Sequence, residues 1–328
     1  MVGLSHVSFR RLLREYLPAG ARTIWPTEML NSRRLPDEDL TRLAESRRDS
    51  EETNLVPQIL GNEETYISRS VRKLEGWGAT AIDINMGCPV KKALKHNFGV
   101  SLMGDAAYAA EVVAMTVRST HLPVSVKLRA GFTGEPEFLK GFVKNLESAG
   151  ASWISFHPRR AEQQRRGRAD WRQIKLVREH LSIPVIGNGD VQIADDVFAM
   201  LKQTGCDMVM VGRALTAKPW LLWQIGEKLG FAPPIGRRGL APKGGLEEAN
   251  EYGKILLRMA DYLLNDYGPE LGYKKFRFFV LNGSCWLDFG QQLYSLVAKA
   301  KTFVEVKPRL VDYFSQELRM REKTELRF

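Results

Sequence analysis

The sequence is poor in cysteine and contains no long hydrophobic run. Only three cysteines, Cys88, Cys206 and Cys285, occur among its 328 residues. Their number and wide spacing exclude a disulfide framework and a zinc site, so no metal centre is expected. No apolar stretch is long enough to span a bilayer, and the N-terminus lacks the apolar core of a secretory signal. The sequence therefore predicts a cytoplasmic protein with no membrane partner.

Acidic residues are fewer than basic ones. The chain has 48 Lys and Arg against 38 Asp and Glu, a formal net charge of +10, and nearly all of the excess lies within residues 1–246. Because Lys and Arg gain affinity for polyanions by displacing counterions from phosphates, a nucleic-acid partner is favoured. No pattern indicates an obligate protein partner, so a monomer is expected.

Short apolar runs alternate with amphipathic helical patterns along most of the chain. The runs cover residues 55–60, 81–85, 124–129, 153–157, 185–188 and 208–212. Repeated strand–helix units predict a parallel sheet, either open or closed. In 124–129 one face is valine and leucine, while the other is polar (Ser125, Lys127 and Arg129). Since helices cover both faces of an open sheet, a polar second face favours an α/β fold of the (β/α)8 TIM-barrel type.

A segment rich in Gly, Pro and basic residues divides the chain. It covers residues 231–246 and is typical of a linker. Beyond it, apolar residues recur at helical spacing near 249–264, 270–282, 290–304 and 308–325. We therefore expect a catalytic barrel domain over residues 1–230, a basic linker over 231–246 and a small all-helical domain over 247–328.

Six consecutive predicted strands end in a polar residue or a glycine turn. These strand ends are Gln58, Asn85, Lys127, His157, Asn188-Gly189-Asp190 and Gly212-Arg213. The active site of a TIM barrel lies at the carboxyl ends of its strands, so we expect these residues to form one site. Most of them taken singly have an ordinary structural explanation. A lysine inside a barrel, however, needs an anion or an acceptor to offset its desolvation.

The last two strand ends have the features of a phosphate site. Barrels commonly bind phosphate after the seventh and eighth strands, between loop amides and a short extra helix. Gly189 and Gly212 would let backbone N–H groups approach the phosphate, and Arg213 would add a charged contact. A phosphate with Lys127 beyond it favours FMN, with the lysine facing the electron-rich edge of the flavin ring.

Cys88 lies in a loop just after the strand 81–85, where a group of lysines follows it (Lys91, Lys92 and Lys95). An unperturbed thiol has a pKa of about 8.5 and is mostly protonated at neutral pH. Cys88 is therefore suited to act as a general acid, and the nearby cations would stabilise the thiolate it leaves. Cys206 and Cys285 lie in contexts that favour packing roles.

Basic residues gather on three segments. The loop after the strand 153–157 carries Arg159, Arg160, Arg165, Arg166 and Arg168. The lysines after Cys88 form the second run, and the third lies in the predicted linker (Arg237, Arg238 and Lys243). A charge run is usually a solvated surface. Three runs expected at the same mouth favour a rim that binds phosphates of a nucleic acid.

At this point the residues resemble the tRNA-dihydrouridine synthase family. The specific match is Ile82-Asp83-Ile84-Asn85-Met86-Gly87-Cys88-Pro89, with Gly99 eleven residues after the cysteine. The other strand ends also occur in the family's order. The resemblance implies an FMN-dependent TIM barrel with a helical C-terminal domain. Such an enzyme reduces a uridine in the D-loop of tRNA to dihydrouridine and uses NADPH as the reductant.

The resemblance also implies a role for each site residue. Cys88 would protonate C5 of the uracil while hydride from the reduced flavin reaches C6. FMN would be held by Gln58, Lys127, His157, Asn188, Gly189, Asp190, Gly212 and Arg213. The uracil, flipped out of its stack, would be positioned by Asn85, Lys127, Arg129 and His157. The charge run, and not the resemblance, leads us to expect that the tRNA phosphates meet Arg159, Arg165, Arg166 and Arg168.

Two features depart from the family's pattern. Its first strand normally ends in Ala-Pro-Met, whereas this sequence begins Met1-Val2-Gly3. We therefore expect the first barrel strand to be truncated here, either because the start lies upstream or because the strand is lost. Val100 follows Gly99 where the family has a small residue, so the Cys88 loop is expected to sit slightly differently.

Two alternative functions remain open from the residues. The first is an FMN-dependent dehydrogenase of a free pyrimidine, against which the arginine loop and the helical domain argue, because a small base needs neither. The second is a non-catalytic tRNA-binding relative that has lost its cofactor together with the first strand. A purified protein without flavin absorbance that FMN cannot restore would favour the second.

Overall fold

The computed structural model describes residues 1–164 and 166–325, which form two compact units. We call residues 24–190 and 196–210 the barrel unit. The helical unit comprises residues 1–23, 191–195 and 211–325. It thus includes the N-terminal residues and residues 211–230, which the sequence places with the barrel. The predicted domain boundaries at residues 230 and 246 stay predictions.

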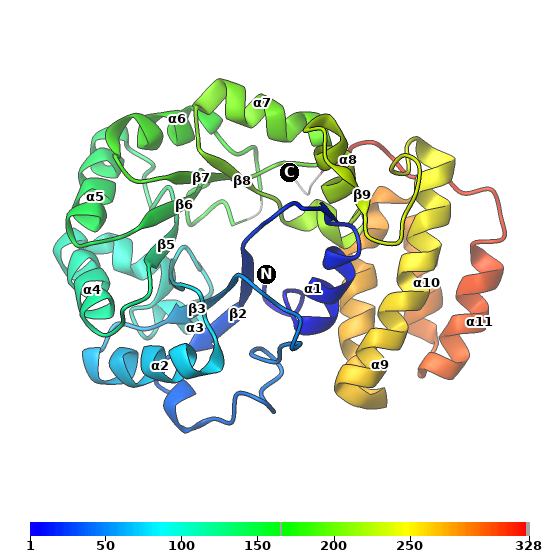
Figure 1. Ribbon diagram of the computed structural model, residues 1–328, viewed down its shortest axis with the longest axis horizontal. Coiled ribbons are helices and arrows are strands. Elements are labelled where there is room, and N and C mark those ends of the chain that lie inside the picture. Colours follow the sequence, from blue (N-terminus) through cyan, green and yellow to red (C-terminus); the bar gives the residue numbers. More distant parts are fainter. Residues whose placement is uncertain (165, 326–328) are drawn as a thin grey trace. The chain divides into compact units, whose positions relative to one another are not determined.

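Seven parallel strands form the sheet of the barrel unit, in the order β2-β3-β4-β5-β6-β7-β8. The predicted TIM-barrel-like sheet is confirmed, and within the described residues β2 and β8 are its edges. Figure 1 shows the sheet curling, with helices on its outer side. The strands are β2 (Trp25–Asn31), β3 (Leu55–Leu60), β4 (Ile82–Met86), β5 (Val124–Arg129), β6 (Trp153–His157), β7 (Val185–Asn188) and β8 (Met208–Met210).

The helices between the strands bury one apolar face each. In α5, Leu139, Phe142, Val143 and Leu146 recur at the spacing of one helical face and are at most 1% exposed. Burying each such side chain contributes about 1.5–3 kcal/mol. The other elements are η1 (Leu35–Asp37), α2 (Glu64–Trp77), α3 (Lys91–Leu94), η2 (Gly99–Gly104), α4 (Ala106–Arg118), α5 (Pro136–Ser148), α6 (Trp171–His180) and α7 (Ala194–Thr204).

The two faces of the strands differ as their sequence pattern predicts. Val126 and Leu128 of β5 are fully buried on the helix side. On the other face the register sets Asp83 opposite Ser125 and Asn85 opposite Lys127. The interior of the barrel unit therefore carries a row of polar side chains, and this row positions the candidate site.

The helical unit is built around the long helix α9 (Gly245–Gly283), which breaks at Gly268. Gly268 has φ of +74°, and Pro269 after it has no N–H to continue the helix. No helix within residues 1–164 and 166–325 combines the length and hydropathy that a membrane span requires. The unit also contains α1 (Val7–Arg14), η3 (Arg213–Thr216), α8 (Leu221–Lys228), η4 (Ser284–Trp286), α10 (Gly290–Lys299) and α11 (Phe303–Tyr313).

Three details of the helical unit correct the expectations. The helix predicted near 308–325 ends at Tyr313. The predicted linker contains β9 (Ala232–Pro234), which pairs antiparallel with β1 (Pro18–Ala19). Cys285 is exposed, so its predicted packing role is wrong, whereas Cys206 is buried as expected.

Candidate active site

A hydrogen-bonded group of side chains occupies the interior polar row of the barrel unit. Ser125 Oγ donates to Asp83 Oδ1 and Gln58 Nε2 donates to Asp83 Oδ2, each at 2.6 Å. Asn85 Nδ2 donates in turn to Gln58 Oε1 at 2.7 Å. Burial raises the pKa of Asp83, while the hydrogen bonds from Gln58 and Ser125 and the charge of Lys127 oppose the shift. The structure thus joins the predicted site residues Gln58 and Asn85 directly, and it anchors Gln58 to a carboxyl for which the sequence suggested no role.

The turn that carries Cys88 is tied to this group. Asn85 Oδ1 accepts the N–H of Gly87 at 3.1 Å and that of Cys88 at 2.9 Å. The Cys88 carbonyl accepts the N–H of the fully buried Val100 at 3.1 Å. Gly99 has φ of +61°, and a Cβ on it would lie 2.5 Å from the Cys88 carbonyl oxygen, so only glycine fits. The thiol itself is half-buried.

Lys127 brings a cation to the same interior. Burial and the neighbouring Arg129 together lower its pKa from 10.5 to about 8, although Asp83 and Cys88 oppose the shift. Within the part of the chain that the structure describes, its ammonium donates no hydrogen bond and forms no ion pair with a protein group. Because burying an ammonium without an acceptor is costly, this donor set suits a ligand that offers an acceptor or a negative charge.

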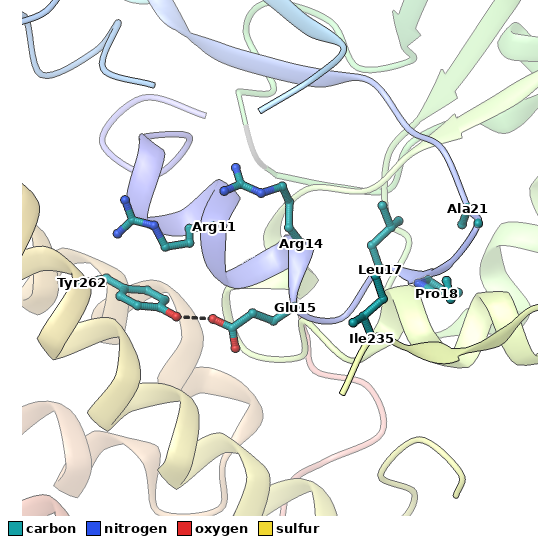
Figure 2. Close-up of a pocket in the computed structure, with 10 residues that line it drawn as sticks. Arg11, Arg14, Glu15, Leu17, Pro18, Ala21, Ile235 and Tyr262 are labelled. Carbon is teal, nitrogen blue, oxygen red and sulfur yellow. Dashed lines mark hydrogen bonds between the residues drawn. The ribbon is translucent and has the colours of Figure 1, made fainter. Parts of the chain in front are cut away.

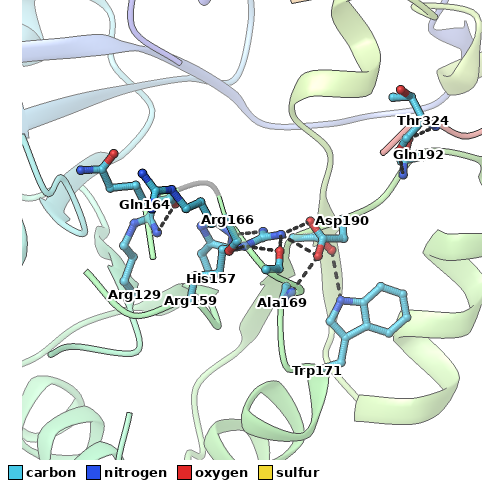
Figure 3. Close-up of polar contacts among 12 residues, drawn as sticks. Arg129, His157, Arg159, Gln164, Arg166, Ala169, Trp171, Asp190, Gln192 and Thr324 are labelled. Carbon is cyan, nitrogen blue, oxygen red and sulfur yellow. Dashed lines mark hydrogen bonds and ion pairs between the residues drawn. The ribbon is translucent and has the colours of Figure 1, made fainter. Parts of the chain in front are cut away.

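A buried arginine joins the loops after β6 and β7, as Figure 3 shows. Arg159 is 1% exposed, and its guanidinium donates to Asp190 Oδ1 and Oδ2 at 2.6 and 2.8 Å. The same group donates to the Gly167 carbonyl at 2.6 Å. Arg159 was expected on a phosphate-binding rim; this expectation is corrected, because its charge is buried and engaged within the protein. In this structure Arg159 holds the arginine loop against β7.

The same arginine determines the proton position on His157. Arg159 Nη1 lies 3.1 Å from His157 Nε2. A guanidinium has donors and no acceptor, so Nε2 must be the unprotonated nitrogen. In this arrangement the ring is neutral with its proton on Nδ1, and His157 is a donor through that atom.

The turn after β7, where the sequence predicts a phosphate site, is closely packed. Gly189 has φ of +128°, and a Cβ there would lie 2.7 Å from that of Ala169. Trp171 Nε1 donates to the Gly189 carbonyl at 3.0 Å, and the Ala169 N–H donates to Asp190 Oδ2 at 2.7 Å. Asn188 Nδ2 donates to the Met210 carbonyl at 2.7 Å, which links β7 to β8.

The remaining predicted site residues belong to β5, to the loop after β6 and to the helical unit. Arg166 and Arg168 are exposed on the loop after β6, and Arg129 is half-buried with Nη1 bonded to the Gln164 carbonyl at 2.8 Å. Arg165 lies outside the described residues. Gly212 and Arg213 belong to the helical unit, where Arg213 begins η3.

The other two basic runs are the lysines that follow Cys88 and the basic residues of the predicted linker. Lys91 and Lys95 are exposed around α3. Arg237 pairs with Glu251 at 2.9 Å and stacks on Tyr16, while Lys243 pairs with Glu227 at 3.2 Å. The expected rim function of the third run is therefore weakened, because two of its three cations form ion pairs inside the helical unit.

The helical unit contains a pocket of about 460 Å³. In Figure 2, Tyr262 of α9 donates to Glu15, which also pairs with Arg258. Arg11 of α1 pairs with Asp266 at 3.1 Å. These contacts fasten α1 to α9, and none of the predicted site residues lines the pocket. Its lining residues are Arg11, Arg14, Glu15, Leu17, Pro18, Ala19, Gly20, Ala21, Ile235 and Tyr262.

Sequence reasoning missed three contributors to the site. Asp83 and Ser125 were visible on the polar face of their strands but were given no role. Met29 comes from β2, which was not predicted, and its sulfur lies 3.2 Å from Asn85 Nδ2. The register Met29–Gln58 would have revealed it once β2 was known.

Comparisons with known protein sequences agree on one family. The sequence model described as "Dihydrouridine synthase (Dus)" matches residues 1–285. A probable tRNA-dihydrouridine synthase of Rickettsia conorii is 34% identical over 274 residues, 83% of this chain and 78% of the relative. One from Mycobacterium tuberculosis (strain CDC 1551 / Oshkosh) is 29% identical over 314 residues, 93% of this chain and 78% of the relative. The fold is similar to that of histamine dehydrogenase from Rhizobium sp. 4-9 (TM-score 0.53, 12% identity, 80% of this chain and 46% of that one).

Proposed function

The chain belongs to the dihydrouridine synthase family, and on that premise we propose that it is a tRNA-dihydrouridine synthase whose reaction takes place in the barrel interior. The observation that carries the proposal is the Cys88 turn, which is tied to Asn85 and lies within the electrostatic reach of Lys127. A half-buried thiol near a cation can give up a proton and remain as a stabilised thiolate.

The reaction adds two hydrogens across the C5–C6 double bond of a uracil. FMN, when bound and reduced by NADPH, supplies the hydride that reaches C6. Cys88 gives its thiol proton to C5 and is left as a thiolate, which Lys127 stabilises before solvent returns the proton. Asn85, Lys127, Arg129 and the Nδ1–H of His157 hold the uracil. Its nucleotide must leave the stack because a stacked base cannot enter the barrel.

The donor set of the barrel unit fits FMN. Lys127 offers an unengaged ammonium for the acceptor edge of the ring, and Gln58 is fixed by Asp83 and Asn85. Asn188, Gly189 and Asp190 form the close-packed turn for the phosphate, with His157 beside it. The cofactor roles expected for Gly212 and Arg213, which follow β8 in the chain, stay predictions from the sequence.

We assign the tRNA backbone to the exposed arginines after β6. Arg166 and Arg168 remain phosphate contacts in this proposal, together with Arg165. Arg159 acts instead as the residue that fixes their loop. The target in our proposal is a D-loop uridine of tRNA.

The experiment that tests this function compares substrates. Purified protein, FMN and NADPH are incubated with unmodified tRNA, free uracil or orotate, and dihydro products are measured by mass spectrometry. We expect dihydrouridine in tRNA alone. Reduction of a free pyrimidine without tRNA would instead identify a dehydrogenase of small bases.

FMN affinity should depend on the charge of Lys127. Since burial lowers this pKa to about 8, the ammonium is present below that pH and lost above it. Affinity of the apoprotein for FMN should therefore fall between about pH 7 and 9, approaching tenfold per pH unit at the upper end. An ordinary lysine would keep its charge to about pH 10.5.

Fluorescence titration with FMN measures this dependence. Lys127→Arg, which keeps its charge at all these pH values, should remove the fall and serves as the control. A wild-type affinity that stays constant over the same range would contradict the role of Lys127.

Arg166 and Arg168 should control the salt dependence of tRNA binding. Replacing both with alanine should raise the KM for tRNA and reduce the slope of log affinity against log salt by roughly 0.7–0.9 for each tRNA phosphate that is no longer neutralised. A matched control, Arg118→Ala with Lys144→Ala, removes two exposed cations from α4 and α5. An arginine-loop variant with the wild-type slope would mean that the loop is only solvated surface.

A further inference from the structure

Five hydrogen bonds connect a buried carboxyl to the Cys88 turn without a break. Ser125 and Gln58 donate to Asp83, Asn85 donates to Gln58, and the N–H groups of Gly87 and Cys88 donate to Asn85. Asp83 is 6% exposed, Gln58 and Asn85 are 7% exposed and Ser125 is fully buried. Water therefore has little access to replace a missing partner.

The hydrogen bonds along this line have one direction. A carboxylate only accepts, so Gln58 must turn its amide nitrogen toward Asp83 and its oxygen toward Asn85. Asn85 must then turn its own nitrogen toward Gln58, which leaves its oxygen for the two backbone N–H groups. A protonated Asp83 is compatible with the same direction when its hydroxyl points to Ser125 and its other oxygen accepts from Gln58, but the ionised carboxylate is the form that imposes it.

We propose that Asp83 is a positioning residue that, through the Gln58 and Asn85 amides, fixes the turn holding the thiol of Cys88. The part that concerns proton transfer rests on the proposed function, but the hydrogen-bond relay does not. With the direction reversed, the Asn85 NH2 group would face two N–H donors. The turn would then lose both of its hydrogen bonds from an interior position, where such losses are costly.

The relay predicts a local effect of Asp83→Asn. An amide at position 83 offers both a donor and an acceptor, so Gln58 and Asn85 are no longer held in one orientation. Hydrogen exchange of the Gly87 and Cys88 amides should accelerate about tenfold or more, the scale of removing one hydrogen bond to a charged group. Exchange in the outer helices should stay unchanged, which separates this role from a general loss of stability.

Ser125→Ala is the matched control. It removes the other hydrogen bond to Asp83 but leaves the direction of the amides unaltered. Exchange at Gly87 and Cys88 should then remain at the wild-type rate. Equal acceleration in the two variants, or none in Asp83→Asn, would overturn the relay.

A reciprocal exchange of the two polar residues gives the sharper test. In Asn85→Asp, Gln58 lies between two carboxyls and can donate its NH2 group to only one. Adding Asp83→Asn relieves this conflict, because Gln58 can turn over, accept from Asn at position 83 and donate to Asp at position 85. Asp83→Asn should therefore lower the Tm when position 85 is asparagine and raise it when position 85 is aspartate.

This change of sign distinguishes the relay from simple loss of a buried group, which lowers Tm in both backgrounds. A double variant no more stable than Asn85→Asp would overturn the proposal. If Asp83→Asn alone does not fold, a folded double variant still supports it.

The activity of Asp83→Asn on tRNA provides a separate test. Asp83→Asn should lower kcat on tRNA about tenfold or more, with little change in the KM for tRNA, because the proton donor is displaced while the proposed arginine contacts with the tRNA backbone remain. Normal kcat with accelerated exchange would restrict Asp83 to a structural role and overturn the positioning proposal. A wild-type protein inactive on tRNA would refute the proposed function, while the exchange and Tm results would still decide the relay.

Discussion

Cys88→Ala should form dihydrouridine in tRNA about 100-fold more slowly than the wild type, the scale expected for loss of a general acid. The structure provides the reason, because Cys88 is a half-buried thiol on a turn fixed by Asn85 and Val100. The other two cysteines were not predicted as site residues; Cys206 is buried in the barrel unit and Cys285 belongs to the helical unit. Binding of FMN and its reduction by NADPH should be unchanged, because neither step uses a proton donor at C5.

The role of Cys88 as the proton donor is tested by three rates: flavin reduction, flavin reoxidation by tRNA and dihydrouridine formation. Only the last two should fall in Cys88→Ala. Cys285→Ser is the matched control, since it removes an exposed thiol that has no role in the proposed chemistry. Wild-type turnover by Cys88→Ala would exclude its role as the proton donor.

Arg159→Met should destabilise the barrel unit by about 3 kcal/mol or more, the usual cost of removing one partner of a buried ion pair. Asp190 would lose two hydrogen bonds, and the carbonyl of Gly167 would lose a third. The neutral form of His157 would also lose the donor that fixes its proton on Nδ1. FMN should bind more weakly in the folded fraction, because both loops of the proposed phosphate site are released.

Urea denaturation with FMN absent measures the stability change. Arg166→Met on the same loop is the control and should cost little, because its side chain is exposed. Arg159→Met combined with Asp190→Asn should be less destabilised than Arg159→Met alone, since no carboxylate is then left without its partner. Equal stability of Arg159→Met and Arg166→Met would contradict the buried pair.

The sequence predicted the barrel because its strong signals are local. Six strands were recognised from short apolar runs, and their polar faces correctly indicated which side chains line the interior. β2 escaped because Pro26, Glu28 and Asn31 interrupt both the alternation and the apolar run. It becomes a strand through its pairing with β3, where Leu30 and Trp25 are buried.

For the site, too, the sequence revealed local features but missed contacts between residues far apart in the chain. The positions of Gln58, Asn85 and Lys127 follow from strand parity, and the loop position of Cys88 follows from its sequence context. The burial of Arg159 does not follow, because its partner Asp190 lies 31 residues further along the chain. A count of charges on a loop cannot distinguish an arginine that meets solvent from one that pairs beneath the surface.

Whether the protein reduces uridine in tRNA is tested most directly by the reoxidation of its reduced flavin by unmodified tRNA. Protein loaded with FMN is reduced with NADPH under anaerobic conditions and mixed with tRNA, and the flavin absorbance is followed while dihydrouridine is counted. We expect rapid reoxidation with one dihydrouridine formed per flavin, and a reoxidation rate about 100-fold lower in Cys88→Ala. Reduced flavin that persists with tRNA but is reoxidised by a free pyrimidine would contradict it.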